Sequence, residues 1–520
     1  MLNQTFPWLT TLIVVPVVGA LALWFLPRGL RARARQIALG FALLTLVLAV
    51  LAATTFDMAR AGSHQLLEQV AWIPQIGASW ALGVDGVGLA LVLLSVVLVP
   101  VVILAAWREH PEEDGQVGGD RNRHYLALVL VLTALMVAIF AARDVFLFYV
   151  VFEAMLIPVY FMIGQFGGPQ RRYAAVKFLL FSLAGGLIML VGVIALYFQG
   201  PGGPEAFLVE NVTGLGMTPT VERLLFLSFF IAFAVKAPLW PVHTWLPDAA
   251  EQAPAGTSVL LVGVLDKVGT FGMLTLCLPL FPAASQWAAP AIVVLAVISV
   301  LYGALLAIGQ QDLMRLIAYT SVSHFGFMVL GIFAFTSTGI AGSSFYMVNH
   351  GISTGALFLL AGFLVARRGS ARLDDFGGLQ KVAPVLAGTF LVAGLATLSL
   401  PGLAPFVSEY LVIVGSFATQ PVATVLATLG VILAALYVLI AYQKIFTGPV
   451  GGGLTTTPDL CGREKWVIGP LVALLLVLGI FPGPALDLVS DPAGVVLDMV
   501  GLADPEPTLG AFTPIDGSDL

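Results

Sequence analysis

The sequence predicts an all-α polytopic membrane protein with about 14 transmembrane helices. Of its 520 residues, 59% are hydrophobic and only 10% are charged, and the mean hydropathy is +1.00. A soluble domain of this size could not bury so much apolar surface, whereas lipid can solvate it. Apolar segments of about 20 residues recur along the chain, and this is the length of helix that crosses the hydrocarbon core of a bilayer.

Fourteen segments have this length and composition. They fall at residues 8–26, 35–55, 85–107, 124–141, 145–166, 173–198, 222–245, 253–280, 287–309, 312–335, 341–366, 383–418, 422–446 and 466–490. The first is interpreted as a retained helix, because the charges that follow it stand on the wrong side for a cleaved signal. The twelfth is too long for one straight helix and contains Pro401 and Pro405, so we expect it to be broken.

The distribution of basic residues supports this helix count. If the N-terminus lies outside, most of the 23 Lys and Arg residues fall in inside loops, and only Arg60, Arg143 and Arg223 fall in outside loops. Lys177 lies about one turn from an inside end and is expected to extend its ammonium group to that face. Arg143 and Asp144 are expected at an interface. The sequence therefore predicts fourteen spans with both termini outside.

A second break is predicted in the seventh span, because Pro238, Pro241 and Pro247 follow Lys236. Counted in fives from spans four and nine, the fourth helix of each unit is then broken, and the two units start on opposite sides of the membrane. Inverted repeats with paired broken helices are typical of transporters. The predicted organisation is three N-terminal helices in 1–123, one repeat in 124–281, the inverted repeat in 282–447, and a last helix with a tail in 448–520.

Ionisable residues near the middle of the spans are the candidate functional residues. They are Glu153, Lys236, Lys267, His324, His350 and Glu409, with His243 just past the first break as a seventh. An ammonium group in hydrocarbon costs about 3 kcal/mol, so such groups normally face a protein interior or a hydrated path. A lone membrane histidine is about as often a structural hydrogen-bond donor between helices. Because the six lie in different helices at similar depth, the pattern favours a proton relay.

The remaining motifs exclude several kinds of site. Cys277 and Cys461 lie far apart without a CxxC pattern, so a disulfide framework or an iron–sulfur cluster bound by this chain is not expected. No glycine-rich nucleotide motif is present. We therefore expect no cofactor and no metal bound by this chain, and no nucleic-acid partner.

Four stretches carry a family resemblance. They are FEAMLIPVYFMIG, VKAPLWPVHTWLPDAAEQAP, LIAYTSVSHFGFM and NHGISTGALFLLAG. The chain resembles, over essentially its whole length, the M subunit family (mitochondrial subunit 4) of proton-pumping NADH:quinone oxidoreductase, respiratory complex I. That family shares its fold with large subunits of Mrp-type cation/proton antiporters. The last stretch points to the M branch, and an Mrp-type sodium/proton antiporter subunit is the alternative.

The resemblance implies roles for the candidate residues. Glu153 would pair with Lys236 on the broken helix, and Lys267 would be the central lysine. His324 and His350 would continue a hydrated axis with His243 alongside, and Glu409 would be the terminal residue. The chain would be a subunit of a proton-translocating enzyme in the bacterial inner membrane, without redox chemistry of its own. NADH, FMN, iron–sulfur clusters and quinone would bind partner subunits, and its neighbours would be other complex I membrane subunits, including sister antiporter-like subunits, and lipid.

Asp266 departs from the family pattern, which has an apolar residue before the central lysine. Adjacent residues on a helix project about 100° apart, so Asp266 and Lys267 do not face the same way. A bare carboxylate facing lipid is costly. We expect Asp266 to be hydrogen-bonded to a neighbouring helix or held neutral, and to tune Lys267 modestly when ionised. A tolerated polar residue at a helix break is the alternative.

Overall fold

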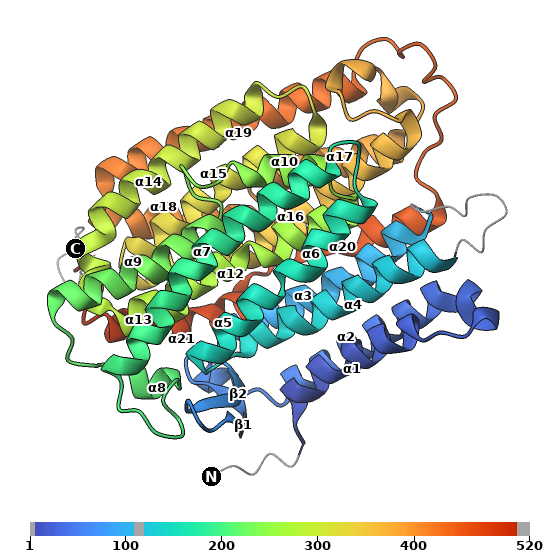
Figure 1. The fold of residues 1–520 in the computed structure, drawn as a ribbon. Helices are drawn as coiled ribbons and strands as arrows, with labels where there is room; N and C mark the ends of the chain where they lie inside the picture. Colours follow the sequence, from blue (N-terminus) through green and yellow to red (C-terminus); the bar gives the residue numbers. More distant parts are fainter. Residues whose placement is uncertain (1–5, 109–118, 507–520) are drawn as a thin grey trace, which may run out of the picture.

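The computed structural model describes residues 6–108 and 119–506, in which long helices lie side by side in one bundle (Figure 1). Within these ranges, ten helices are long and apolar enough to cross a membrane, or eleven if one bent pair counts as a span. Shorter apolar helices cover 8–24, 384–397 and 404–419. Each of the fourteen predicted segments contains a helix, so the predicted fold class is confirmed.

The N-terminal part combines four helices with a small sheet. Its elements are α1 (Trp8–Trp24), α2 (Ala34–Thr54), β1 (Gln65–Ile73), β2 (Ala78–Val84), α3 (Gly86–Ala105) and α4 (Gly119–Ala141). β1 and β2 pair in an antiparallel hairpin in which Gln65 lies opposite Val84. The sequence analysis did not predict this hairpin. Asp144 is buried and accepts hydrogen bonds from the backbone N–H groups of Ser79 and Leu147. It thus ties β2 to the next helix, and its predicted position at a membrane interface stays a prediction.

The middle of the chain contains the first predicted break. Its elements are α5 (Val145–Ala154), α6 (Leu156–Phe166), α7 (Arg171–Gln199), α8 (Val209–Val212), α9 (Pro219–Lys236), α10 (Trp245–Gln252), α11 (Ala255–Leu260), α12 (Lys267–Gly272) and α13 (Leu278–Leu280). Helix α9 stops at Lys236 and α10 begins at Trp245, as predicted. The following span is interrupted by two π-helical turns, η4 (Leu261–Leu265) and η5 (Met273–Cys277).

The second half contains the longest helices. Its elements are α14 (Pro282–Ile308), α15 (Leu313–Phe333), α16 (Ser337–Arg368), α17 (Pro384–Thr397), α18 (Ala404–Thr419), α19 (Pro421–Phe446), α20 (Gly462–Ile480) and α21 (Gly483–Met499). The break between α17 and α18 is the second predicted one. The last predicted helix, 466–490, is instead two helices, α20 and α21, which meet at a bend of 69°. Pro482 and Pro484 at the bend cannot donate the backbone hydrogen bonds of a continuous helix, which explains the difference.

Short 3₁₀ turns join several of these helices. They are η1 (Arg28–Arg33), η2 (Met58–Arg60), η3 (Ala106–Arg108), η6 (Leu373–Asp375) and η7 (Leu379–Lys381). Side-chain caps begin other helices: Asp312 caps α15 and Thr336 caps α16. Helix α16 ends at Gly369, whose φ of 74° is the left-handed conformation that glycine adopts freely.

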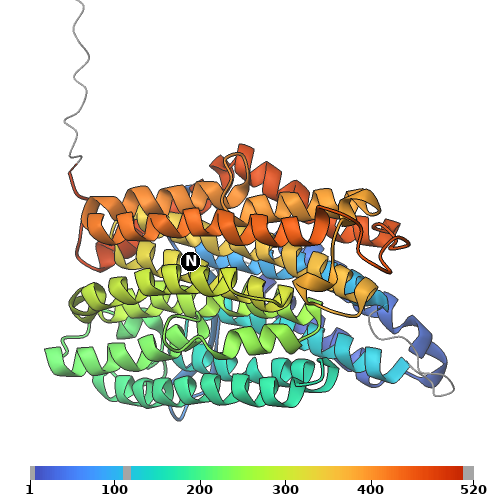
Figure 2. The same cartoon turned by 90° about the horizontal axis from the view of Figure 1, so that it is seen from above.

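Small residues let the central helices approach closely. A Cβ on Gly326 of α15 would lie 2.6 Å from the carbonyl oxygen of Ala296, and one on Gly303 of α14 would lie 2.7 Å from the amide nitrogen of Ser323. In membranes such contacts replace the hydrophobic driving force. Viewed from above, the green helices of the first half lie along one side and the orange helices of the second half along the other, with yellow helices between them (Figure 2). The candidate residues lie in this layered interior.

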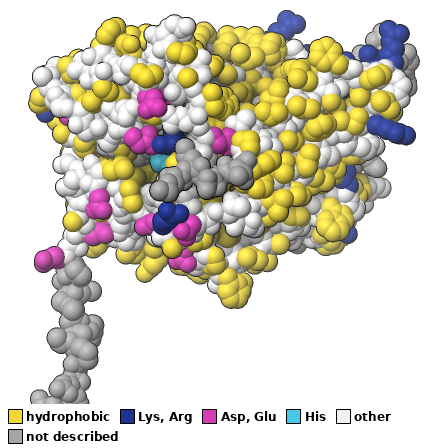
Figure 3. Space-filling view, turned by 90° about the horizontal axis from the view of Figure 1, so that it is seen from below, with side chains coloured by type: hydrophobic (Ala, Val, Ile, Leu, Met, Phe, Trp, Pro, Cys, Tyr) yellow, Lys and Arg dark blue, Asp and Glu magenta, His cyan; other side chains and the backbone are white. Residues whose placement is uncertain are grey.

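The distribution of apolar and charged side chains on the surface is typical of a membrane protein. Apolar side chains are exposed along three helices: 55% of Val47 on α2, 68% of Val191 on α7 and 62% of Ile432 on α19 are accessible. Figure 3 shows hydrophobic side chains spread over one face, acidic side chains with a few Lys and Arg at one end, and Lys and Arg without acidic side chains at the other. This polarity along the helix axes agrees with the charge segregation in the sequence.

Candidate functional site

Lys236 lies at the break between α9 and α10. Its side chain is fully buried, and its Nζ lies 5.3 Å from the ring centroid of Phe152 and 5.5 Å from that of Phe178. No other described residue forms a hydrogen bond with this ammonium group. The break itself is held by Trp245, whose Nε1–H donates to the carbonyl oxygen of Val235 over 2.9 Å. The proline-rich segment therefore leaves a cation among aromatic faces, where cation–π attraction replaces part of its hydration.

Glu153 lies near the end of α5, just before the junction with α6. It is half-buried and lies against α7, where a Cβ on Gly186 would come within 1.6 Å of Oε1. That oxygen has no hydrogen-bond partner among the described residues. Lys236 acts on Glu153 electrostatically, but the two do not form an ion pair in the described structure. The expected pairing is therefore a through-space interaction and not a contact.

Lys267 begins α12, between the two π-helical turns. Its buried Nζ donates to the carbonyl oxygen of Val262 and contacts Nδ1 of His350, each over 2.6 Å. It also lies 4.8 Å from the ring centroid of Phe325. A π-helical turn shifts the side chains that follow it and is frequent at functional sites. Here the turn directs Lys267 towards α16.

The two predicted histidines lie together next to Lys267. The ring centroids of His324 on α15 and His350 on α16 are 5.1 Å apart. Nε2 of His324 lies 3.3 Å from the hydroxyl of Tyr437 on α19. The ring of Tyr346 lies 5.9 Å from His324 and 6.4 Å from His350. The structure thus brings Lys267, both histidines and two tyrosines into one buried cluster.

Glu409 on α18 terminates this cluster. It is 4% exposed and accepts a hydrogen bond of 3.0 Å from the hydroxyl of Tyr346 and another from the hydroxyl of Ser399. Sequence reasoning missed Tyr346 and Ser399. Tyr346 stands four residues before His350, which places both on one face of α16 and is the signal that could have identified it. Ser399 lies in the break before α18, where a non-helical backbone turns its side chain inward.

His243 does not lie in this cluster. It is buried in the break after α9, and its ring packs edge-on against Tyr302 and Tyr319 at centroid distances of 5.4 and 6.5 Å. Its Nδ1 has no hydrogen-bond partner within the described ranges. The ring of Tyr319 also lies 5.8 Å from the guanidinium carbon of Arg315. The structure therefore separates His243 from His324 and His350 and associates it with the end of α10.

An ion-pair cluster closes that end of the molecule. Asp248 on α10 accepts from Nζ of Lys177 on α7 and from Nη1 of Arg315 on α15, each over 2.5 Å, and Arg315 also binds Glu251 over 2.9 Å. Lys177 is therefore ion-paired, and its predicted position at an inside face stays a prediction. Burial would raise the pKa of Asp248, but hydrogen bonds from Lys177 and Arg315 outweigh it and hold the pKa below its usual 3.8.

Asp266 is completely buried, and neither carboxylate oxygen has a hydrogen-bond partner among the described residues. The expected hydrogen bond to a neighbouring helix is therefore not found there. The charges that act on Asp266 are those of Lys267 and Lys236. Gly269, three residues later, packs against Phe233 and Ala237, which places Asp266 near the end of α9 that carries Lys236. The sequence analysis had assigned Lys236 to Glu153 and had not foreseen this neighbour.

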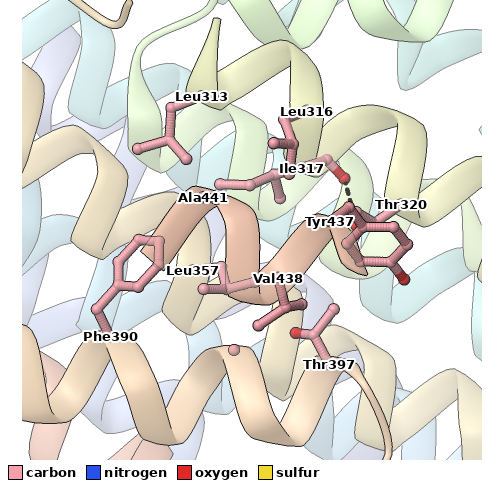
Figure 4. A pocket seen from close by; sticks show the side chains of 11 residues that line it. Leu313, Leu316, Ile317, Thr320, Leu357, Phe390, Thr397, Tyr437, Val438 and Ala441 are labelled. Carbon is pink, nitrogen blue, oxygen red and sulfur yellow. Dashed lines mark hydrogen bonds between the residues drawn. The ribbon is translucent and has the colours of Figure 1, made fainter. Parts of the chain in front are cut away.

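A small pocket lies beside Tyr437 (Figure 4). It is lined by hydrocarbon, and Thr320, Thr397 and Tyr437 are among the lining residues. The two threonine hydroxyls donate to carbonyl oxygens of their own helices, at Ile317 and Ala393. Because these hydroxyls already form hydrogen bonds, the pocket offers few free polar groups. We therefore do not include it in a path for protons.

Comparison with known proteins identifies the family. The model described as "NADH:quinone oxidoreductase/Mrp antiporter, TM" matches residues 142–436, more than half of the chain. The NADH-quinone oxidoreductase subunit M of Mycobacterium tuberculosis is 48% identical over 98% of both chains. This chain belongs to the subunit M family of NADH-quinone oxidoreductases. It is an integral membrane protein of the bacterial inner membrane and a subunit of such an enzyme.

Solved structures agree with this assignment. A chain of respiratory complex I from Thermus thermophilus with bound NADH matches with a TM-score of 0.85 and 33% identity, covering 95% of this chain and 100% of that chain. A chain of the Mrp complex from Dietzia sp. DQ12-45-1b has a TM-score of 0.83 but only 21% identity, covering 94% and 97%. The Mrp chain shares the fold. The assignment to subunit M of complex I is better supported than the Mrp alternative.

Proposed function

We propose that this chain translocates protons through a relay that runs from Glu153 to Glu409 and is driven by quinone reduction elsewhere in the complex. The observation that carries this proposal is the buried line of titratable groups across the bundle. Lys267 contacts His350, the two histidine rings lie 5.1 Å apart, and Tyr346 joins their cluster to Glu409. Such groups are energetically costly in a membrane interior, and where they occur they mark ion or proton pathways.

The two broken helices support a transporter mechanism. Lys236 is the last residue of α9, and Glu409 lies in the second turn of α18, so each break stands beside a buried ionisable group. Broken helices near such groups are the usual design of ion sites in transporters. We propose that 124–281 and 282–447 are inverted repeats that meet at Lys267 and His350, with 1–123 and 448–520 packed around them.

His243 has a separate role in this proposal. It lies next to the ion-pair cluster of Lys177, Asp248 and Arg315, at one end of the bundle. A neutral imidazole can accept a proton on one nitrogen and donate one from the other. We assign His243 to a route that connects this end of the molecule with the interior of the relay.

Redox chemistry belongs to partner subunits in this proposal. NADH, FMN, iron–sulfur clusters and quinone would bind there, and this chain would bind no cofactor and no nucleic acid. Its partners would be other membrane subunits of complex I, including the sister antiporter-like subunits, and its remaining apolar surface would face lipid. The exposed side chains of Val47, Val191 and Ile432 lie on helices at different edges of the bundle, which leaves room for both kinds of contact.

Replacing Glu153 by Gln tests the proposal. The carboxylate is lost while size is kept, so we expect NADH-driven proton pumping in inverted membrane vesicles to fall by about tenfold or more per assembled complex. Assembly should persist, because Glu153 forms no ion pair in the described structure. Lys236→Ala should act similarly, and the double variant should be no worse than the worse single one, since coupled groups are non-additive.

Glu205→Gln is the matched control, because Glu205 is exposed and its carboxylate contacts only the exposed Gln69 side chain and no relay group. Pumping by this variant should equal that of the unmodified protein. Normal pumping by Glu153→Gln at unchanged subunit content would rule out the relay that starts at this residue.

A further inference from the structure

Asp266 is a buried carboxylate that the relay described above does not use. Its side chain is 0% exposed, and both oxygens lack a hydrogen-bond partner in the described part of the chain. Burying a carboxylate without hydrogen bonds costs several kcal/mol unless it is neutral or compensated by nearby charge. A residue that served only packing would be more stable as a leucine. The position therefore calls for a role for the carboxyl group itself.

The packing of α12 fixes the direction of Asp266. Gly269 stands three residues later, on the same face of the helix. A Cβ on Gly269 would lie 2.4 Å from the amide nitrogen of Ala237 and 2.5 Å from the carbonyl oxygen of Phe233. This face of α12 therefore abuts the end of α9, whose last residue is Lys236. Lys267, about 100° further around, turns instead towards His350.

The relay lacks a hydrogen-bonded link at the same place. Lys267 is hydrogen-bonded to His350, whereas Lys236 has no hydrogen bond to any described residue. Asp266 directly precedes Lys267 in the chain, and its face of the helix abuts the end of α9 that carries Lys236, so it neighbours both cations. The charges of both lysines act on its carboxylate.

We propose that Asp266 carries the proton from Lys236 to Lys267. In the first transfer an N–H bond of the Lys236 ammonium breaks and an O–H bond forms on the Asp266 carboxylate, which leaves a neutral amine and a neutral acid. In the second transfer that O–H bond breaks and an N–H bond forms on the neutral amine of Lys267. One proton moves between the lysines, and Asp266 returns to its carboxylate form.

This inference rests on the proposed function, because it inserts a step into that relay. It also explains why the carboxylate has no fixed partner. A strong hydrogen bond to a backbone or hydroxyl group would stabilise one protonation state and oppose the return of the other. The π-helical turn that ends at Leu265 hydrogen-bonds the amide of Asp266 to the carbonyl oxygen of Leu261 over 3.0 Å, and so fixes the backbone while the carboxyl group stays available.

Two substitutions of Asp266 test the proposal in the intact complex. Asp266→Asn keeps the shape and removes the titration, and Asp266→Leu also removes the buried polar group, so the second variant should assemble at least as well as the first. Both should lower NADH-driven proton pumping, expressed per assembled complex, by about tenfold or more. Asp266→Glu restores a carboxyl group and should recover most of the pumping, which a merely structural role would not predict.

Thr270→Val is the matched control. Thr270 is fully buried one turn further along α12, and its hydroxyl donates to the carbonyl oxygen of Lys267 in its own helix. This variant should pump normally. Pumping by Asp266→Asn or Asp266→Leu at the level of Thr270→Val would overturn the inference. Glu153→Gln, measured in parallel, separates the two proposals: if it alone abolishes pumping, only the Asp266 step fails, and if neither does, the relay itself fails.

Discussion

At the scale of single residues, the buried cluster depends on groups of two kinds. Lys267, His350 and Glu409 are ionisable and interrupt apolar spans, so they are visible in the sequence. Tyr346 is different, because its ring is compatible with a membrane interior and only its hydroxyl is polar. In the structure that hydroxyl donates to Glu409 over 3.0 Å. The link between the histidines and the terminal carboxylate therefore depends on one oxygen atom.

Tyr346→Phe isolates this oxygen. The ring that packs against His324 and His350 is kept, so assembly should be unchanged, while Glu409 loses a hydrogen bond and retains the one from Ser399. We expect pumping in inverted vesicles to fall by about tenfold. Tyr442→Phe on α19 is the control, since that ring stacks on Phe446 away from the relay. Equal pumping by the two variants would exclude Tyr346 from proton transfer.

The sequence was sufficient to select the ionisable residues but not their neighbours. Because a charged side chain in hydrocarbon is energetically costly, Lys236 and Glu153 can be identified as candidates without any coordinates. That Asp266 lies near Lys236 depends on how α12 packs against α9, and the close approach of these helices is made at Gly269. A glycine in an apolar run gives no sign of which helix it will contact. The role of Asp266 could therefore be inferred only from the structure.

At the scale of elements, breaks and charge clusters organise the helices. Prolines predicted the interruptions at 237–244 and 398–403, because each removes a backbone donor. The π-helical turns η4 and η5 contain no proline, and the hairpin β1–β2 follows no run of strict alternation, so neither was predictable from pattern. The cluster around Asp248 joins α7, α10 and α15, which belong to the two predicted repeats. It fixes how these helices meet beyond the first break.

Asp248→Ala should destabilise this junction. Lys177 and Arg315 are less than one-third exposed, and removal of their shared partner leaves Lys177 unpaired in this cluster and Arg315 with Glu251 alone. We expect the free energy of unfolding to fall by about 1–3 kcal/mol, measured as a lower melting temperature of the chain in the purified complex. Because the pKa of Asp248 is below its usual 3.8 in the folded state, this stabilisation is present above that value and lost only as the pH falls through the lowered pKa.

Asp374→Ala provides the comparison for that measurement. Asp374 pairs with Lys444 over 3.0 Å, but both side chains are about half exposed. Ion pairs of this kind contribute roughly 0–1 kcal/mol because solvent screens them. A melting temperature lowered equally by both substitutions would mean that the Asp248 cluster is no more than a surface ion pair.

At the scale of the whole molecule, the chain has more exposed apolar surface than a soluble protein could carry. The exposed residues lie on α2, α7 and α19, at separate edges of the bundle (Figure 1). Charged residues gather towards the two ends of the face that Figure 3 shows. Lipid and neighbouring membrane subunits both cover surfaces of this kind, since each removes apolar side chains from water. Fold similarity alone does not decide whether the chain assembles with complex I subunits or with Mrp subunits, because chains of both complexes match it, with TM-scores of 0.85 and 0.83.

Purification of the tagged chain in a mild detergent separates these assemblies. Identity to the subunit M of Mycobacterium tuberculosis, at 48%, is more than twice the 21% found with the Mrp chain. We therefore expect quinone-reductase subunits to copurify in constant ratio, with NADH:quinone reductase activity in the same fraction. Sodium/proton exchange by a fraction that contains Mrp-type subunits, or a chain that purifies alone and still exchanges ions, would contradict the assignment to complex I. The Glu153→Gln variant, purified in parallel, should bring down the same subunits with the same quinone reductase content, because its defect lies in proton transfer and not in assembly.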